Sequence, residues 1–264
     1  MENTISRKKN NDWELVIKDD IKYIESKLLL KYGFKHAFFT KESNNFKPEE
    51  ILKYFNGSST IHKVKQVHGN KVIHASKSLS NENISADGLI SDKVNQGLWV
   101  YSADCIPLLF ADPLNGFVAA SHAGWKGLSK NIIKETINEM EKLGCERPKI
   151  VVALGPCISM KNYEVGEELI TEISKTLDLN GYSIKKTISN MNKLGIANID
   201  RGSNMMYLDI RIAAYYQLIK EGLLTDRISI SPYCTFSNYK LFNSWRRENK
   251  KLLQWSCIIS DKYK

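Results

Sequence analysis

The sequence predicts a single-domain α+β protein, because short apolar stretches typical of strands mix irregularly with fewer stretches of helical periodicity. Irregular mixing favours this class over a doubly wound sheet, in which strands and helices alternate. No internal repeat and no linker rich in Pro, Gly or Ser divides the 264 residues, a length that can bury a substantial core. We therefore expect one domain over residues 1–264, with the polar residues 1–11 only loosely ordered.

The N-terminal quarter of the chain contains short strands and one short helix. Strand-like apolar stretches cover Trp13–Ile17 and Phe34–Thr40. Pro48–Phe55 has the pattern of a short helix with Pro in its first turn. The stretch Ile61–Ala75 predicts a strand, a tight turn and a second strand, which places His68 at the turn.

The stretch Ser102–Gly127 predicts an antiparallel hairpin that carries reactive residues at its outer ends. Two apolar runs, Ile106–Phe110 and Phe117–Ala120, flank an Asp-Pro-Leu-Asn-Gly turn. Cys105 precedes the first run and His122 follows the second. Because a hairpin brings its outer ends together, we expect this thiol and this imidazole to be neighbours in space.

A helix follows the hairpin after a loop that contains glycine. Apolar residues at helical spacing cover Leu128–Leu143, and Gly144 ends the helix. Its N-terminus is expected near His122, where a helix start is a natural anion site. Further strands are predicted at Ala86–Ile90, Leu98–Tyr101, Ile150–Leu154, Ile228–Ile230 and Leu252–Ile259. Further helices are predicted at Gly166–Leu177 and Tyr207–Leu218, and the polar residues 180–202 are expected to form an excursion or mobile loop.

Composition and charge indicate which kinds of binding partner and which cellular location to expect. The formal net charge is +9, but the lysines are spread along the chain and form no basic block, so we expect no nucleic-acid partner. No apolar run approaches the ~20 residues that span a bilayer, and the N-terminus lacks the apolar core of a secretory signal. The five cysteines are widely spaced and include no CxxC, which favours reduced thiols. We expect a cytoplasmic protein without a membrane partner; the sequence predicts no oligomeric state.

Three residues in different stretches form a candidate reactive site: His68, Cys105 and His122. Two imidazoles and a thiolate suit Zn²⁺ or Cu²⁺, and three protein ligands leave a fourth position for water or substrate. The residues alone leave two alternatives open, a Cys/His catalytic pair and no site at all. Asp87 and Asp104 are available as partners of the ligands or as a general base.

Eight short blocks of the sequence match the pattern of a known family. The matching blocks are HAFFT at His36–Thr40, QVHGN at Gln66–Asn70, ADG at Ala86–Gly88, SADCIPLLFAD at Ser102–Asp112, SHAGWKG at Ser121–Gly127, LGPCI at Leu154–Ile158, YEVG at Tyr163–Gly166 and SWRREN at Ser244–Asn249. In this order they resemble the YfiH family, also described as the multicopper polyphenol oxidase or laccase-domain family. This family includes purine nucleoside phosphorylases and a peptidoglycan editing factor.

The resemblance implies a fold, an activity and a ligand set. The fold is a four-layer α/β/β/α sandwich with mixed sheets. The activity is phosphorolysis of adenosine, inosine and 5′-methylthioadenosine to base and sugar 1-phosphate, with some deamination of adenosine. The family's metal ligands match His68, Cys105 and His122, with zinc usual and copper reported. Alternatives are a cell-wall (peptidoglycan) editing hydrolase and a copper-dependent phenol oxidase, although five histidines could hardly build the several copper sites of a true laccase.

The partners implied by this activity are a purine nucleoside and inorganic phosphate. Lys126 and Arg246 or Arg247 are candidates for binding phosphate, and Trp125 could stack on the base. The residues expected to bind polar edges of the substrate are Gln66, Asn70 and Asp87.

The chain departs from the family pattern on the expected substrate side. Lys126 stands where Arg is common, which keeps the charge and loses the planar fork. FFTKESNN at Phe38–Asn45 replaces a glycine-containing FxTRxGGVS block, and Glu248 and its successors replace a Gly-rich segment. These departures put substrate specificity in question and leave the three metal ligands intact.

Overall fold

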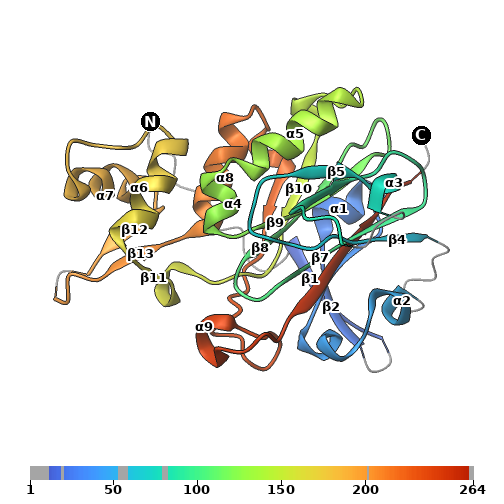
Figure 1. The fold of residues 1–264 in the computed structure, drawn as a ribbon, viewed down its shortest axis with the longest axis horizontal. Coiled ribbons are helices and arrows are strands. Elements are labelled where there is room, and N and C mark those ends of the chain that lie inside the picture. The colour runs from blue at the N-terminus through green and yellow to red at the C-terminus, as the bar shows by residue number, and fades with distance from the viewer. Residues whose placement is uncertain (1–11, 19–20, 53–58, 79–82, 201, 262–264) are drawn as a thin grey trace.

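Two six-stranded sheets form the centre of the molecule, as the computed structural model describes it for residues 12–18, 21–52, 59–78, 83–200 and 202–261 (Figure 1). The first sheet contains, in spatial order, β1 (Trp13–Lys18), β2 (Ile21–Ser26), β3 (His36–Phe39), β15 (Gln254–Ile259), β7 (Gln96–Ser102) and β4 (Thr60–His62). The second contains β14 (Ile228–Ile230), β10 (Val151–Leu154), β8 (Ile106–Ala111), β9 (Val118–Ala123), β6 (Gly88–Ile90) and β5 (Val72–His74). Both sheets are mixed, because each combines parallel and antiparallel neighbours.

A small third sheet and the helices complete the fold. The third sheet contains β11 (Glu164–Val165), β13 (Met206–Leu208) and β12 (Ala197–Ile199). The helices are α1 (Lys27–Lys31), α2 (Pro48–Ile51), α3 (Ala75–Ser78), α4 (Trp125–Ser129), α5 (Ile132–Lys142), α6 (Glu167–Thr176), α7 (Ile184–Asn192), α8 (Ile210–Lys220) and α9 (Trp245–Glu248). The third sheet lies with α6 and α7 at one end of the molecule (Figure 1). No described helix combines the length and apolar character needed to cross a membrane.

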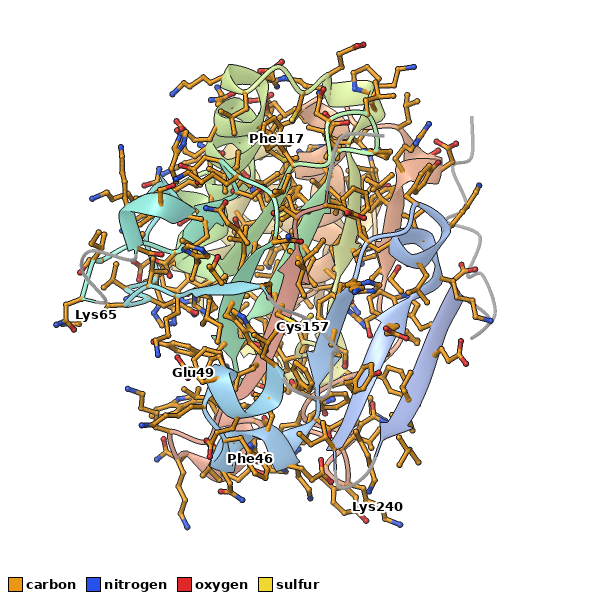
Figure 2. The ribbon with its side chains drawn as sticks, turned by 90° about the vertical axis from the view of Figure 1, so that its right-hand side faces the viewer. Phe46, Glu49, Lys65, Phe117, Cys157 and Lys240 are labelled. Carbon is orange, nitrogen blue, oxygen red and sulfur yellow. The ribbon has the colours of Figure 1, made fainter. Side chains whose placement is uncertain are left out.

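Side chains cover both faces of the sheets (Figure 2). In β8, Leu108 and Phe110 contribute to the core beneath α5 and α8, whereas Leu109 belongs to the core between the two sheets. On the outer face of the first sheet, Trp99 packs in a smaller cluster with Ile51 of α2. The order of layers is therefore helices, sheet, sheet and short helix. This confirms the α+β class and the predicted sandwich, whose outer helical layer is small.

The stretch Ile61–Ala75 is not the predicted hairpin. β4 pairs in parallel with β7 of the first sheet, and β5 pairs in parallel with β6 of the second. The residues between them form a connection from one sheet to the other. His68 lies in this connection with a φ of 57°, in the left-handed region. Periodicity predicted the two strands but could not show that they enter different sheets.

The helix predicted at Leu128–Leu143 is two helices. Asn131 adopts a left-handed conformation, with a φ of 62°, and separates α4 from α5. The helix that begins beside His122 is therefore the five-residue α4, whose dipole is small because few peptide units align. Side-chain periodicity continues across the break because both helices bury their apolar residues in the same core.

Of the stretch 180–202, for which the sequence predicts an excursion or mobile loop, the structure describes residues 180–200 and 202, and residues 180–200 include α7 and β12. The Ser183 side chain accepts a hydrogen bond from the backbone N–H of Lys186 and caps α7. Ile188 and Met191 of α7 are buried in the core beneath the second sheet. The predicted helix at Tyr207–Leu218 begins later, because Tyr207 lies in β13 and Asp209 caps α8.

The remaining predicted strands are present within a few residues of their expected ends. The helix predicted at Pro48–Phe55 is observed as α2, and its residues after 52 lie outside the described part of the chain. The loose ordering expected for residues 1–11 also concerns residues that the structure does not describe.

Protonation of His36 should destabilise the protein at acidic pH. His36 is fully buried; its Nε2 accepts from the Ser26 N–H at 2.8 Å and its Nδ1 lies 2.9 Å from the Phe34 carbonyl oxygen. Burial lowers the pKa of His36 to about 4, although the bond to Phe34 opposes this. The unfolded chain takes up this proton near pH 6.5, so stability is complete above that pH and falls toward pH 4. We expect a loss of about 3 kcal/mol from this residue.

Urea unfolding between pH 7 and pH 4.5 measures this loss, with His36→Gln as the reference. Carboxylates that titrate in both proteins cancel in the difference between the two free energies of unfolding. That difference should shrink as the pH falls. A difference that is independent of pH would contradict the assignment.

Candidate metal centre

His68, Cys105 and His122 converge on one point. One ligand atom from each lies within 4.8 Å of the others. The imidazoles of His68 and His122 meet edge to face, with ring centroids 4.8 Å apart. The structure therefore brings together the three residues that the sequence singled out as ligands.

The hairpin of β8 and β9 explains the pairing of Cys105 and His122. Pro107 lies opposite His122 and Ile106 lies opposite Ala123, so Cys105 is at the open end of the hairpin beside His122. This confirms the predicted hairpin, although His122 lies inside β9 rather than beyond it. Every residue of both strands is buried, which holds these two ligands on a rigid support.

Asp87 links His122 to the connection that carries His68. Its Oδ1 accepts from the His122 Nδ1–H at 2.9 Å and from the His68 backbone N–H at 2.9 Å. Its Oδ2 accepts from the backbone N–H groups of Val67 and Gly69, at 3.1 Å and 2.7 Å. The bond to Nδ1 assigns the tautomer of His122 and leaves Nε2 as the free electron-pair donor.

The charges of the site favour a thiolate. Burial alone would raise the pKa of Cys105, but the imidazoles of His122 and His68 outweigh it and lower the pKa to about 7. Burial would likewise raise the pKa of Asp87, and the hydrogen bonds from His122, Gly69 and Val67 hold it below its usual value. A thiolate is the form of cysteine that binds metal, and a soft sulfur with two imidazole nitrogens suits zinc or copper. The three residues therefore fit a bound metal ion.

Gly124 makes room for the site, a role that the sequence did not predict. It is the N-cap of α4 with an ordinary φ of −80°, so its backbone does not require glycine. A Cβ at this position would lie 2.6 Å from Cys105 Sγ and 3.4 Å from a ring carbon of His68. Space beside the ligands is therefore the reason for glycine. The signal in the sequence was its place one residue beyond the hairpin.

Gln66 and Asn70 flank the His68 connection and hold it in place. The Gln66 amide donates to the Tyr101 carbonyl and accepts from the Tyr101 N–H, both at 2.8 Å, and so fastens the connection to β7. Asn70 donates from Nδ2 to the Lys130 carbonyl at 2.7 Å. Their predicted contacts with substrate remain predictions.

Trp125 and Lys126 begin α4 next to the site. The Lys126 Nζ lies 5.5 Å from the centre of the Trp125 ring, and the lysine is exposed while the tryptophan is half-buried. An exposed cation beside a partly exposed aromatic face is compatible with the predicted contacts to phosphate and base, which remain predictions.

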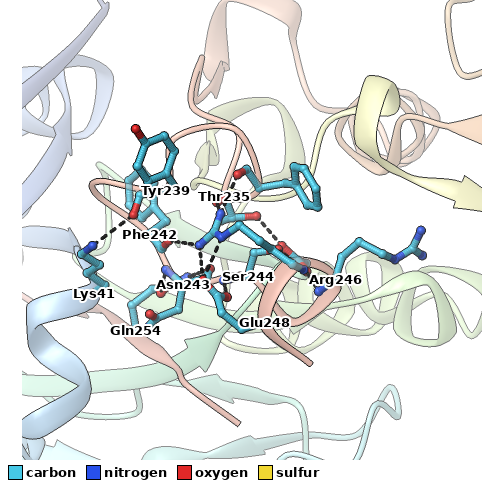
Figure 3. Close-up of polar contacts among 12 residues, drawn as sticks. Lys41, Thr235, Tyr239, Phe242, Asn243, Ser244, Arg246, Glu248 and Gln254 are labelled. Atoms are coloured by element: carbon cyan, nitrogen blue, oxygen red, sulfur yellow. Dashed lines mark hydrogen bonds and ion pairs between the residues drawn. The ribbon is translucent and has the colours of Figure 1, made fainter. Parts of the chain in front are cut away.

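Arg246 and Arg247 occupy different surroundings. Arg247 donates to the carbonyls of Thr235, Phe236 and Phe242 and pairs with Glu248, so its guanidinium is enclosed by protein partners. Arg246 extends away from this network (Figure 3). It is exposed and donates to the Glu164 carbonyl at 3.0 Å.

Tyr163 lies against Arg246, and the sequence did not single it out as a site residue. The Arg246 guanidinium lies 5.1 Å from the centre of the Tyr163 ring. Burial raises the pKa of Tyr163, and the negative charge of Cys105 raises it further. Tyr163 therefore lies within electrostatic reach of the thiolate. Its place in the YEVG block was the signal that could have found it.

The other three histidines serve elsewhere. His36 and His62 are buried and hydrogen-bonded in the core, and His74 lies near Asp92 and Glu139. Within the described residues, His68, Cys105 and His122 are the one group with the arrangement of metal ligands. This part of the chain therefore offers a single metal site rather than several.

A family model described as multi-copper polyphenol oxidoreductase laccase matches residues 47–259. The chain belongs to this family. It is 34% identical over 239 residues to the purine nucleoside phosphorylase slr1573 of Synechocystis sp., which covers 85% of this chain and 89% of that protein. It is 30% identical over 161 residues to adenosine deaminase RL5 of an unknown prokaryotic organism, covering 61% and 55% of the two chains.

A solved structure confirms the laccase-domain fold. YlmD from Geobacillus stearothermophilus superimposes with a TM-score of 0.77 over 94% of this chain and 98% of that chain, at 20% sequence identity. The resemblance inferred from the sequence blocks is therefore confirmed at the level of family and fold. The names of the relatives support an enzyme that acts on purine nucleosides.

Substitution of Gly124 should weaken metal binding by the three candidate ligands, whereas the same substitution at the start of another helix should not. In Gly124→Ala, the new Cβ would collide with Cys105 Sγ, so we expect metal content to fall at least about tenfold. Gly166 is a matched control, because it caps α6 with a nearly identical backbone and a Cβ added there would meet no described atom within 4 Å beyond its chain neighbours. Elemental mass spectrometry of both purified variants measures the loss. Equal metal content in the two would contradict this account of Gly124.

Proposed function

We propose that this protein is a metal-dependent purine nucleoside phosphorylase that acts on adenosine, inosine and 5′-methylthioadenosine, with deamination of adenosine as a second reaction of the same site. The observation that carries the proposal is the convergence of His68, Cys105 and His122, backed by Asp87. The relatives named purine nucleoside phosphorylase and adenosine deaminase support the substrate class. Zinc is the proposed metal, with copper as the alternative.

The proposed reaction transfers the ribosyl group from the purine to phosphate. A phosphate oxygen forms a bond to the anomeric carbon, and the glycosidic bond breaks with its electron pair leaving on the base. A metal ion held by the three ligands supplies Lewis acidity to this site. Asp87 orients the His122 ring and holds the backbone of His68, and the half-buried Trp125 offers a face for the purine.

Arg246 is the better of the two neighbouring arginines for phosphate. Arg247 has its donors directed at backbone carbonyls and Glu248, whereas the exposed Arg246 donates to the Glu164 carbonyl at the edge of the site. A guanidinium presents paired donors that match phosphate oxygens. Lys126 supplies a second exposed cation beside the ligands. We assign the phosphate co-substrate to Arg246 and Lys126.

A thiol hydrolase is the second candidate, because one feature of the geometry favours it. Cys105, His122 and Asp87 are arranged in the order of a nucleophile, a base and an orienting carboxylate. The charges of Cys105 and Asp87 raise the pKa of His122 although burial lowers it, as in a thiolate–imidazolium pair. A cell-wall hydrolase could use such a pair. His68 distinguishes the candidates, because a thiol mechanism needs one imidazole and a metal site uses both.

Inosine should release hypoxanthine only when phosphate is present. We expect His68→Ala and Cys105→Ala each to reduce the rate at least about 10³-fold, because each removes a metal ligand. His74→Ala is the control, since His74 lies near Asp92 and Glu139, and should keep the activity. Liquid chromatography of base and ribose 1-phosphate measures the reaction. Full activity in His68→Ala, with loss in Cys105→Ala, would support the thiol mechanism instead.

Removal of the Arg246 side chain should weaken the binding of phosphate more than the binding of nucleoside. A charge-assisted hydrogen bond is worth about 1.5–3 kcal/mol, so we expect Arg246→Ala to raise the KM for phosphate about tenfold or more. Lys193→Ala, at an exposed lysine after α7, is the control for loss of one surface charge. Steady-state kinetics with each substrate varied separately measures the effect. An equal rise in both KM values would argue against a phosphate contact.

A further inference from the structure

Asp104, immediately before the ligand Cys105, has a constrained backbone. Its φ is 86°, in the left-handed region that side chains other than glycine adopt at a cost. Such a conformation persists only where the surroundings hold it. Asp104 is also buried, with 8% of its surface exposed, so its carboxylate needs hydrogen-bond partners.

The carboxylate of Asp104 finds those partners on a distant segment. Its Oδ1 accepts from the Thr235 hydroxyl at 2.6 Å. Its Oδ2 accepts from the Ser244 hydroxyl at 3.0 Å and from the Arg246 backbone N–H at 2.8 Å. Its main-chain carbonyl accepts from the Ile158 N–H at 3.0 Å. Asp104 therefore joins two other parts of the chain to the residue beside a metal ligand.

The segment from Thr235 to Arg246 is itself held together. Arg247 donates to the carbonyls of Thr235, Phe236 and Phe242, and these contacts close the segment into one unit (Figure 3). The Thr235 N–H also donates to the Cys157 carbonyl at 3.1 Å. A shift of Asp104 would therefore move Arg246 as well, because the segment between Thr235 and Arg246 is held together and cannot change shape independently.

We propose that Asp104 is a positioning residue that sets Cys105 in its ligating geometry and holds Arg246 at a defined place beside it. Both oxygens of the Asp104 carboxylate already accept hydrogen bonds from protein groups. We therefore assign Asp104 this positioning role in place of the role of general base that the sequence also suggested. The part that concerns Arg246 rests on the proposed phosphorylase function. The part that concerns Cys105 depends only on metal binding.

Metal affinity tests the link to Cys105. Asp104→Asn and Asp104→Gly both tolerate a positive φ, and both remove the charged acceptor. Competition with a chelator, using zinc alone, should show about 10–100-fold weaker binding in each variant than in the unchanged protein. Wild-type affinity in Asp104→Gly would overturn the proposal, because it would show that only the backbone conformation matters. Circular dichroism below the melting temperature confirms that the compared proteins are folded.

Phosphate kinetics test the link to Arg246. Thr235→Val removes one donor to Asp104 and keeps the side-chain shape, and it should raise the KM for phosphate about three- to tenfold with little change for inosine. Thr187→Val is the matched control, because Thr187 is also a buried threonine and its hydroxyl accepts from Gly181 in the distant α7 region. Equal KM values for phosphate in the two variants would overturn this link. Absence of phosphorolysis in the unchanged protein would refute the proposed function, while the zinc competition would still decide the role toward Cys105.

Discussion

The buried carboxylate of Asp87 is the constraint on which the candidate site depends. A carboxylate without solvent is costly unless its oxygens are satisfied, and here four N–H donors supply that compensation. Three of the donors are backbone groups of Val67, His68 and Gly69. The same charge therefore orients His122 and shapes the connection that presents His68. The hydrogen bonds that offset the burial of the Asp87 carboxylate are therefore the same bonds that set the geometry of the candidate ligands His68 and His122.

The three candidate ligands lie on two different parts of the fold, the β8–β9 hairpin and the connection between the two sheets. β8 and β9 are buried along their whole length, so packing fixes the backbone of His122 and of the strand that Cys105 immediately precedes. His68 is on a connection that crosses between the sheets, and its position is held by Asp87 and by the Gln66 amide on Tyr101. Packing thus fixes the hairpin backbone, whereas hydrogen bonds orient the His122 ring and hold the connection that carries His68. The crossing itself is what brings the third ligand to the open end of the hairpin.

The C-terminal segment shows how adjacent residues with the same side chain can take different roles. Arg247 donates to three backbone carbonyl groups of the segment and thereby holds it together. Arg246 has its backbone N–H on Asp104 and its side chain in solvent over Tyr163. Their sequence context is nearly identical, so only the direction of each side chain separates a structural cation from one that can meet an anion. The same segment also reaches Asp104, the residue next to Cys105, and so connects the proposed phosphate contact to the candidate metal ligands.

Features that depend on local pattern could be predicted from the amino-acid sequence. The hairpin, and with it the pairing of Cys105 and His122, followed from two apolar runs around a turn, because hairpin register is a local property. The predicted turn after Ile61 added His68 as the third candidate, and the family blocks then matched all three residues to metal ligands. The tertiary structure decided where the connection that carries His68 runs, because periodicity shows that β4 and β5 are strands but not which sheet each one joins. It also decided the break at Asn131 and the helix and strand within residues 180–200, and it showed the network around Asp104, which joins residues far apart in the chain.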